Sequence, residues 1–347
     1  MIDLGVTLVY TFTYKRGRKM KAIGTVDSGR NFIDFEIEKP ILRPHDLLIK
    51  VEAISINPVD TKVRKSIKGT LTQPKILGCD GLGTVVEVGS QNKLFKVGDS
   101  VFWAGDVTRA GSNAEFQAVD ERIVGFAPKN LSKEKAVAMP LTSLTAYELL
   151  FEKLQVTSES KGKSILIING AGGVGSVATQ MAKNAGLTVI ATASDPQAIE
   201  WVKNFGADYT VNHHENLVPQ VHELGFKFVD YILILNAVVE HMPAVNELIA
   251  PQGSIANIVE PGQAINLDKL AHKSARFNFE WMFTKVVSDT DDLQSQHDIL
   301  NQVSEWLDNG TLTSTMTQNL GALTADNVRK AHELIEENHT IGKIVLA

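Results

Sequence analysis

One segment restricts the possible folds more than any other: an apolar strand that runs directly into a glycine-rich turn and a helix. Residues 163–194 read KSILIINGAGGVGSVATQMAKNAGLTVIATAS, in which SILIIN is a continuous apolar run. Such a run is typical of a strand covered on both faces, as in parallel sheets. The same strand type recurs in VDYILILN (229–236) and GSIANIV (253–259). Strands that alternate with helical segments predict an α/β fold with a doubly wound parallel sheet.

The turn itself, NGAGGVG at residues 169–175, fits the pattern G-x-G-x-x-G. Gly170 permits the tight turn, Gly172 lets a pyrophosphate approach the backbone, and Gly175 lets helix and strand pack closely. Free N–H groups at the helix N-terminus favour phosphate. Because the match follows a strand and opens a helix, we predict a dinucleotide site here, with Gly173 and Val174 as further members.

The end of the next strand indicates which dinucleotide binds. An acidic residue about 20 positions after the glycines would hold the ribose 2′-OH of NAD. The sequence instead has Ser194 there, with Asp195 following. Serine tolerates the 2′-phosphate of NADPH far better than aspartate does, so we predict NADPH over NADH. Because no basic residue follows closely, His213 or Lys343 has to supply the positive group, and an exposed loop position remains the alternative for His213.

The regions on either side of this unit have a different pattern. From Lys21 to about Met139, segments such as LLIKVEAISIN (47–57) and GTVVEVG (83–89) alternate apolar and polar residues between Gly, Asn and Ser turns. They predict a small β-barrel or sandwich. From about Thr311 a short β-type tail ends in IGKIVLA.

Residues 1–19 look detached from the rest of the chain, since Met20 opens a strand-like segment. Their positive charges come after the apolar stretch, whereas a secretory signal has the opposite order. We expect a tail or a wrongly assigned start, with a poorly ordered native terminus as the alternative.

Composition and charge argue against several classes of partner. The 347 residues are 44% hydrophobic and 21% charged, which is enough apolar material for two globular domains. A net charge of -6 without a basic stripe argues against nucleic acid and anionic membranes as partners. No apolar run reaches the roughly 18 residues of a membrane span. Cys79 is the only cysteine, which predicts a reducing, cytoplasmic location.

Six motifs carry a family resemblance: SINPVDTKVR (55–64), GCDGLGTVVEVG (78–89), AGDVTRAGSNAEFQAVDERIVG (104–125), MPLTSLTAYELLF (139–151), NGAGGVGS and IGKIVL. Through them, residues 20–347 resemble the medium-chain dehydrogenase/reductase superfamily, and within it the zinc-type alcohol dehydrogenase-like proteins close to the quinone oxidoreductases. The resemblance implies a GroES-like β-barrel catalytic domain (20–144) and a Rossmann NADP-binding domain (145–288). A linking helix and a return to the catalytic domain come next (289–347), and the active site lies between the domains.

The resemblance also allows a comparison of this sequence with the zinc ligands of the family. Zinc-dependent members carry a cysteine near the start of the SINPVD segment and a His-Glu pair in a G-H-E-G turn. Asn57, and Cys79 with Asp80, stand at those places here. A catalytic zinc needs three protein ligands and an open position, and one cysteine cannot form the four-cysteine structural lobe. We therefore expect no zinc, and a structural role for Cys79 as a small, semi-buried turn residue.

Zinc-free relatives reduce quinones or the C=C bond of α,β-unsaturated carbonyls with NADPH, and the resemblance implies this activity. It places Asn57 and Asp60 at the catalytic site, and Thr142 and Thr145 beside the nicotinamide and its ribose. The alternatives are a non-catalytic NADPH-binding redox sensor and a zinc-dependent alcohol dehydrogenase with atypical ligands.

Three further features of the sequence leave two interpretations each. Asp60 and Arg64 either form an ion pair that shapes the catalytic loop or belong to a purely structural turn. Trp103 either stacks on a planar substrate or lies in the barrel core. The aromatic residues of FNFEWMF (277–283) alternate at strand spacing; the corresponding edge strand pairs two subunits in this superfamily, so we expect a homodimer, with core packing as the alternative.

Overall fold

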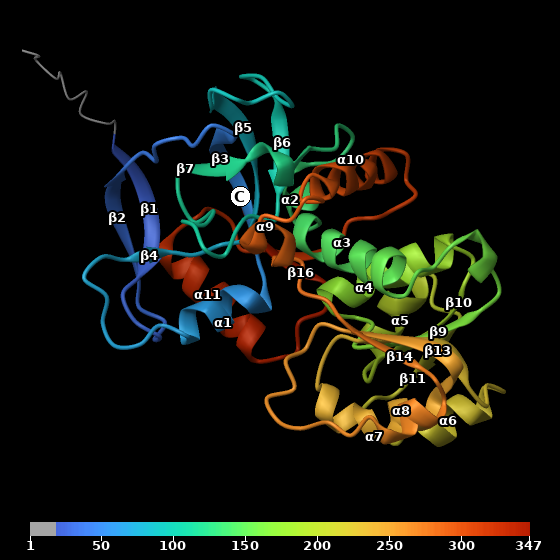
Figure 1. Cartoon of the computed structure of the whole chain (residues 1–347). Coiled ribbons are helices and arrows are strands. Elements are labelled where there is room, and N and C mark those ends of the chain that lie inside the picture. Colours follow the sequence, from blue (N-terminus) through green and yellow to red (C-terminus); the bar gives the residue numbers. More distant parts are fainter. Residues whose placement is uncertain (1–18) are drawn as a thin grey trace, which may run out of the picture.

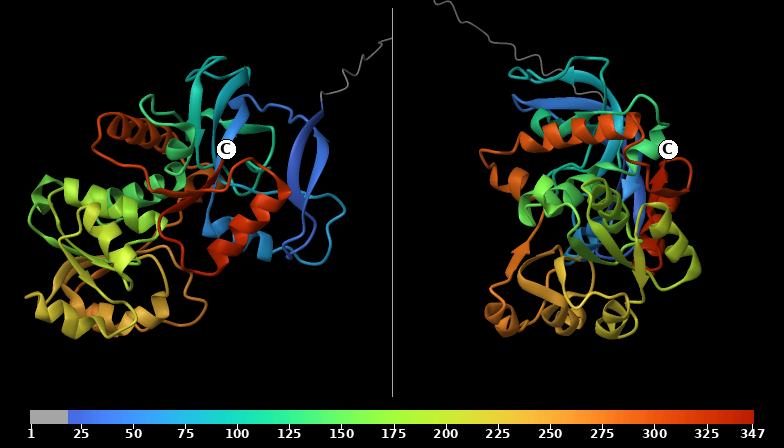
Figure 2. Two further views of the ribbon diagram at one scale, coloured as in Figure 1. Left: turned by 180° about the vertical axis from the view of Figure 1, so that it is seen from behind. Right: turned by 90° about the vertical axis from the view of Figure 1, so that its right-hand side faces the viewer.

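The structure, a computed structural model, describes residues 19–347. Figure 1 shows two lobes: a β-rich lobe built from the early and late parts of the chain, and an α/β lobe built from its middle. Seen from behind in Figure 2, the C-terminal segment, in red, lies against the β-rich lobe. Within residues 19–347, no helix has the length and apolar character needed to cross a bilayer.

A six-stranded parallel sheet forms the α/β lobe, with the order β11-β10-β9-β12-β13-β14. Its strands are β9 (Ser164–Ile168), β10 (Thr188–Thr192), β11 (Tyr209–Val211), β12 (Val229–Ile234), β13 (Ile249–Asn257) and β14 (Arg276–Phe279). With β9 counted first, the order is 3-2-1-4-5-6, the Rossmann arrangement, which binds dinucleotides at the carboxyl ends of the strands. The predicted doubly wound parallel sheet is confirmed.

Alternate side chains of β9 serve the two faces of this sheet. Ile165 and Ile167 belong to the core that contains α4 and α5, whereas Leu166 and Ile168 belong to the core that contains α6, α7 and α8. Burial on both faces is the reason why the strand is apolar throughout. The helices are α4 (Gly173–Asn184), α5 (Pro196–Asn204), α6 (Leu217–Glu223), α7 (Val238–Leu248) and α8 (Asp268–His272).

The long strand β3 (Asp46–Ile56) is the centre of the β-rich lobe, where it pairs with β5, β7 and β16. Its sheet contains β5 (Asp80–Val88), β6 (Ser100–Trp103), β7 (Phe116–Asp120), β8 (Val124–Phe126), β15 (Met316–Asn319) and β16 (Lys343–Leu346). A second sheet has the order β2-β1-β4, with β1 (Lys19–Thr25), β2 (Phe32–Glu38) and β4 (Lys75–Ile76). Ile344 of β16 pairs with Ile56 of β3. A strand near the C-terminus therefore completes the sheet whose central strand comes from the N-terminal part of the chain.

The other helices connect or cover the lobes. They are α1 (Pro58–Lys65), α2 (Lys133–Val137), α3 (Pro140–Tyr147), α9 (Thr284–Ser288), α10 (Ser295–Asp308) and α11 (Ala325–Glu336). A π-helical segment, Glu148–Lys153, extends α3, and 3₁₀ turns occupy Glu121–Ile123 and Ser158–Ser160. The expected domain boundaries stay a proposal: 144/145 lies inside α3, and 288/289 directly follows α9. Of the expected tail, residues 1–18 lie outside the described residues, and Lys19 already pairs with Glu38 in the first sheet.

Trp103 lies in the core of the barrel, so its proposed role as a stacking surface for substrate is wrong. The side chain is fully buried, and its Nε1 donates to Oε1 of Gln117 at 2.8 Å. The ring lies against the backbone of Gly81, where an added Cβ would come within 2.2 Å of Cζ2. This close approach explains one glycine of the GCDGLG motif.

Two other expectations also need correction. Arg64 does not pair with Asp60: its guanidinium donates to Glu336 and to the carbonyl of Ser28, because it faces α11 whereas Asp60 lies in the first turn of α1. The strand expected through Phe283 ends at Phe279, and Phe283 is buried.

We predict that Gly81→Ala destabilises the protein by about 1–3 kcal/mol, because the new methyl group overpacks the Trp103 ring. Val86→Ala on the exposed side of the same strand is the control and should stay within about 0.5 kcal/mol of the original protein. Urea unfolding measures both. A Gly81→Ala protein as stable as the control would show that the Trp103 contact is looser than described.

Candidate active site

The candidate active site lies where three distant segments meet: the glycine turn after β9, the N-terminus of α1 and the start of β16. Gly342 donates its N–H to the carbonyl of Ala171 at 2.9 Å and forms a parallel bridge with Gly172. The next residue, Lys343, sends its side chain past Gly173 toward α1. The α/β lobe and the β-rich lobe are therefore joined at the turn itself.

The glycine turn has the shape that a pyrophosphate needs. A Cβ on Gly170 would lie 2.8 Å from Cβ of Ala191, and one on Gly175 would lie 2.2 Å from the carbonyl oxygen of Asn169. Gly172 is the N-cap of α4, is partly exposed, and no side chain caps the helix. The first N–H groups of α4 therefore remain available to an anion. These residues fit a bound dinucleotide.

The helix α3 brings Thr142 and Thr145 to the same region. The methyl carbon of Thr142 lies 3.1 Å from the position of a Cβ on Gly173. Both hydroxyls donate within their own helix, Thr142 to the carbonyl of Met139 at 3.1 Å and Thr145 to that of Leu141 at 2.8 Å. Each hydroxyl oxygen can still accept a hydrogen bond, which suits a ribose hydroxyl.

A buried hydrogen-bond network surrounds Asn57. The ammonium of Lys343 donates to the side-chain oxygen of Asn57 and, at 2.7 Å, to the carbonyl of Ile56. The amide nitrogen of Asn57 donates to Oδ2 of Asp80 at 2.8 Å. The other oxygen of Asp80 accepts the backbone N–H of Leu141 at 2.8 Å and so caps α3. The polar side chains of this chain of bonds are enclosed by protein, which makes the geometry rigid.

Asp60 holds Asn57 from the other side. Its Oδ2 accepts the backbone N–H of Asn57 at 2.8 Å, and its carboxyl group also bonds to the thiol of Cys79. Burial raises the pKa of Asp60 to about 6. Burial and the nearby Asp60 raise the pKa of the Cys79 thiol well above its usual range, so Cys79 stays a protonated, structural group.

In the same network, burial and the attraction between opposite charges act in opposite directions on the pKa values of Asp80 and Lys343. Burial raises the pKa of Asp80, while the Lys343 ammonium and the hydrogen bond from Asn57 act in the opposite direction. Burial also lowers the pKa of Lys343, against the attraction of Asp80 and Asp60. Lys343 lies 3.5 Å from Oδ2 of Asp80, so the chain supplies its own cation to these carboxyl groups.

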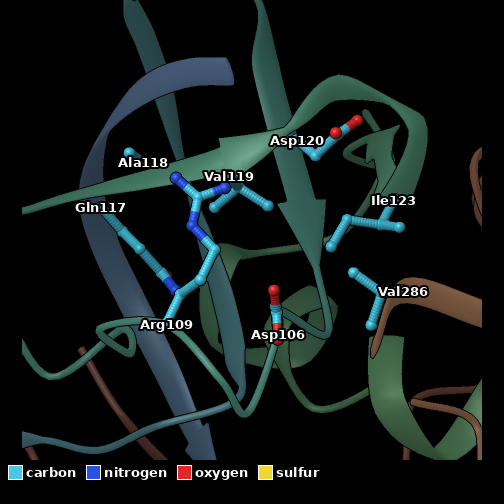
Figure 3. Close-up of a pocket in the computed structure, with 8 residues that line it drawn as sticks. All are labelled: Asp106, Arg109, Gln117, Ala118, Val119, Asp120, Ile123 and Val286. Atoms are coloured by element: carbon cyan, nitrogen blue, oxygen red, sulfur yellow. The ribbon is translucent and has the colours of Figure 1, made fainter. Parts of the chain in front are cut away.

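One small cavity borders this network, and a second shares Asp106 and Arg109 with the first. The first, of about 20 Å³, is lined by Asp60 and Cys79, among others, and has room for one water molecule. The other, of about 10 Å³, is shown in Figure 3, where Arg109 and Asp106 face the strand β7. Arg109 there donates two hydrogen bonds to Asp46, at 2.8 and 2.6 Å. Neither cavity approaches the roughly 300 Å³ at which organic ligands are commonly bound.

The residues at the place expected for a catalytic zinc do not fit that metal. Each oxygen of Asp80 and the side-chain oxygen of Asn57 already accept hydrogen bonds. The ammonium of Lys343 lies among them and would repel a divalent cation. Within residues 19–347, no group of three or more His, Cys, Asp or Glu side chains is arranged to hold a metal ion. Zinc requires a set of three such donors and an open position.

Of the residues predicted to bind the 2′-phosphate, Ser194 and His213 lie at the carboxyl edge of the parallel sheet, whereas Lys343 does not. The bond from the N–H of Ala193 to the carbonyl of Val211, 3.0 Å long, holds the end of β10 beside the end of β11. Ser194 and His213 follow these two ends. The carboxylate of Asp195 caps α5 by accepting the N–H of Ala198 at 2.9 Å. Lys343 is instead enclosed beside Asn57, because β16 pairs with β3, so its expected role at the 2′-phosphate is wrong.

Sequence reasoning missed the part that Asp80 plays in this site. The motif GCDG drew attention to Asp80 only as a possible metal ligand, whereas it links Asn57 to α3. It also missed His241, whose place near His213 depends on the packing of α7 beside α6. No pattern along the chain indicates that the two histidines lie near each other.

We predict that Lys343→Met destabilises the protein by about 3–5 kcal/mol at pH 8, because two buried carboxyl groups lose their cation. The loss should shrink toward pH 5. Without the ammonium, the pKa of Asp80 in the folded state rises further above its unfolded value, so stability is lost as the pH rises through that folded pKa.

The measurement is urea unfolding at several pH values. Lys343→Arg keeps the charge, and Lys330→Met removes an exposed lysine as the matched control. A Lys343→Met protein within about 1 kcal/mol of the control at every pH would contradict the pairing of buried charges at this site.

Comparison with known proteins agrees with this architecture. Residues 43–143 match the family described as "Alcohol dehydrogenase GroES-like domain", and residues 173–294 match "Zinc-binding dehydrogenase". The chain is 43% identical to a "Zinc-type alcohol dehydrogenase-like protein" of Staphylococcus aureus, over 94% of this chain and 99% of that protein.

Two further relatives have more informative names. The "NADPH-dependent alkenal/one oxidoreductase, chloroplastic" of Arabidopsis thaliana is 30% identical, over 90% of this chain and 75% of the relative. The structure of the quinone oxidoreductase from Coxiella burnetii is 25% identical and superimposes with a TM-score of 0.80, over 95% of this chain and 99% of that one. The protein therefore belongs to the zinc-type alcohol dehydrogenase-like proteins in the quinone oxidoreductase group of the medium-chain dehydrogenase/reductase superfamily, with a GroES-like barrel and a Rossmann domain.

Proposed function

We propose that this oxidoreductase uses NADPH, without zinc, to reduce the C=C bond of α,β-unsaturated carbonyls or quinones. The observation that carries the proposal is the buried network of Lys343, Asn57 and Asp80 beside the glycine turn. At this position a zinc-dependent enzyme would need ligand atoms that are free to bind the metal. Here the oxygens of Asp80 and Asn57 already accept hydrogen bonds, and a lysine supplies the positive charge. The names of the Arabidopsis and Coxiella relatives support the same class of substrate.

We assign residues of this chain to three parts of NADPH. The turn from Gly170 to Gly175 would hold the pyrophosphate, Thr142 and Thr145 the nicotinamide ribose, and Ser194 with His213 the 2′-phosphate. NADPH supplies a hydride when it is bound. The protein's own task is to orient the substrate and to stabilise the negative charge that forms on the substrate oxygen.

Asn57 is the group best placed for that second task. Its amide nitrogen has two N–H bonds; one is donated to Asp80 at 2.8 Å, and the other has only a long contact of 3.4 Å with the carbonyl of Ser55. The ammonium on its oxygen polarises the amide and makes the remaining N–H a stronger donor. Asp60 is a positioning residue in this scheme, because it holds the backbone of Asn57. The proton that completes the reduction comes from solvent.

The test is NADPH consumption against a panel of enones, quinones and aldehydes, together with elemental analysis. We expect turnover with an enone or quinone, no stoichiometric zinc and no effect of a chelator. Asn57→Ala should lower kcat by about 10²–10³, the cost of losing one oxyanion donor. Asn31→Ala, at an exposed asparagine, should not change it.

Other outcomes separate the alternatives. NADPH binding without turnover on any member of the panel would identify a non-catalytic binding protein. About one zinc per chain, with activity lost to a chelator, would identify a zinc-dependent alcohol dehydrogenase. Gly172→Val is the cofactor control: its Cβ would lie 2.8 Å from the side-chain nitrogen of Asn169, and its bulk should keep the pyrophosphate from approaching the backbone and so abolish NADPH binding.

We also propose that the protein is a homodimer paired through β14, and that it works in the cytoplasm, as the single cysteine indicates. The strand β14 is the last in its sheet; its final residue, Phe279, is 58% exposed, and Trp281, two residues beyond the strand, is 51% exposed. Exposed apolar groups on an edge strand are a surface that a second strand can cover.

A charge on that edge should prevent pairing. Phe279→Arg is expected to convert the dimer to monomer at micromolar concentration, because two arginines would meet across the twofold axis. Ile41→Arg, at a residue 93% exposed, is the matched control and should leave the dimer intact. Sedimentation velocity measures both. A monomeric original protein would contradict the proposal.

A further inference from the structure

We propose that three histidines, His213, His214 and His241, bind the 2′-phosphate of NADPH in protonated form, so that preference for NADPH over NADH strengthens as the pH falls. The inference rests on the proposed function, because it concerns the same cofactor. It identifies the side chains that recognise the phosphate. It also predicts a dependence of binding on pH, which lysine or arginine side chains at this place would not produce.

The position of the cluster agrees with that role. Ser194 and His213 follow the ends of two adjacent parallel strands, β10 and β11, which the bond from Ala193 to Val211 holds together. Dinucleotides lie along this carboxyl edge, and the end of the second strand, here β10, faces the adenosine ribose. His213 is thus on the strand end next to the ribose position.

The His213 ring has a nitrogen without a hydrogen-bond partner in the described residues. This atom, Nδ1, is buried. The ring packs against that of His214, with centroids 4.4 Å apart. Buried polar atoms are nearly always paired, so this nitrogen is an exception, and His213 as a whole is partly exposed at this edge of the sheet, where a ligand can contact it.

Without an anion, the surroundings of the cluster disfavour protonation of its histidines. Burial, His214 and His241 all lower the pKa of His213. Burial and His214 lower the pKa of His241, whereas Glu240 acts to raise it. Protons on neighbouring imidazoles repel each other, and a phosphate between them removes this repulsion.

The other charged groups around the cluster are accounted for. Glu240 lies on α7 beside His241. Glu215 accepts a hydrogen bond from the side chain of Asn212 at 3.2 Å, and the carboxylate of Asp195 is used to cap α5. In the part of the chain that the structure describes, no lysine or arginine contributes to the pKa shift of His213 or His241. We therefore assign the positive charge at this site to the histidines.

The direction of the pH effect is set by linkage. A phosphate dianion raises the pKa of a histidine that it contacts, so binding takes up protons. Affinity is then highest below the raised pKa and falls as the pH rises through it. The free pKa of His213 lies below 6.5, and the 2′-phosphate itself gains a proton below about pH 6. The useful window is therefore about pH 6 to 8.

The experiment is isothermal titration calorimetry with NADPH, NADH and adenosine 2′,5′-bisphosphate across this window. We expect the Kd of NADPH and of the bisphosphate to rise roughly tenfold or more from pH 6 to pH 8, the value of one charge-assisted hydrogen bond. The Kd of NADH should not change. NMR titration should show the pKa of His213 raised when the bisphosphate is bound.

Two variants decide the assignment. His213→Gln, which leaves His214 and His241 in place, should weaken the pH dependence for NADPH while NADH binding stays as it was, which also shows that the variant is folded. His222→Gln, at an exposed histidine of α6, should keep it. Tight NADPH binding that is independent of pH, or a pH dependence that His213→Gln retains in full or NADH shares, would overturn this inference alone. Failure to bind either dinucleotide at any pH would overturn the proposed function as well.

Discussion

The candidate site depends on the hydrogen bonds and the ion pair that the buried ammonium of Lys343 makes. Two carboxyl groups, Asp60 and Asp80, are enclosed next to a neutral thiol. Charges in such a place are very costly unless they are paired and hydrogen-bonded. Lys343 meets this requirement through Asn57, which accepts from the ammonium and donates to Asp80. The orientation of the Asn57 amide results from this arrangement.

The same lysine connects the two lobes. Its backbone neighbour, Gly342, is bonded to the glycine turn, and its ammonium reaches the first turn of α1. A cation supplied by a side chain differs from a metal ion, since it cannot open a coordination position for substrate. A site of this kind is suited to a reaction in which the cofactor does the demanding chemistry and the protein orients the reactants, as in the proposed reduction.

The sequence predicted what is determined locally. The need for Gly170 and Gly175 arises from atoms a few residues away or on the next strand, so the motif was sufficient. The apolar run of β9 likewise predicted burial on both faces. The partner of Arg64 and the place of Trp103 could not be predicted, because periodicity indicates which face is buried but not what covers it. Lys343 and Asn57 are 286 positions apart, and only the pairing of β16 with β3 brings them together.

That pairing also affects how the protein is made. The ribosome synthesises the chain from its N-terminus, and domains tend to fold as units while synthesis continues. All six strands of the parallel sheet precede β16, so the α/β lobe has its full sequence before the β-rich lobe does. The central strand β3 pairs with β5 and β7 early in synthesis, but its last residues, Ile54–Ile56, have no β16 partner until translation is nearly complete. Until Lys343 emerges, the carboxyl groups of the site have no counter-ion, and a nascent chain that stops short of it carries the dinucleotide turn without the network beside it.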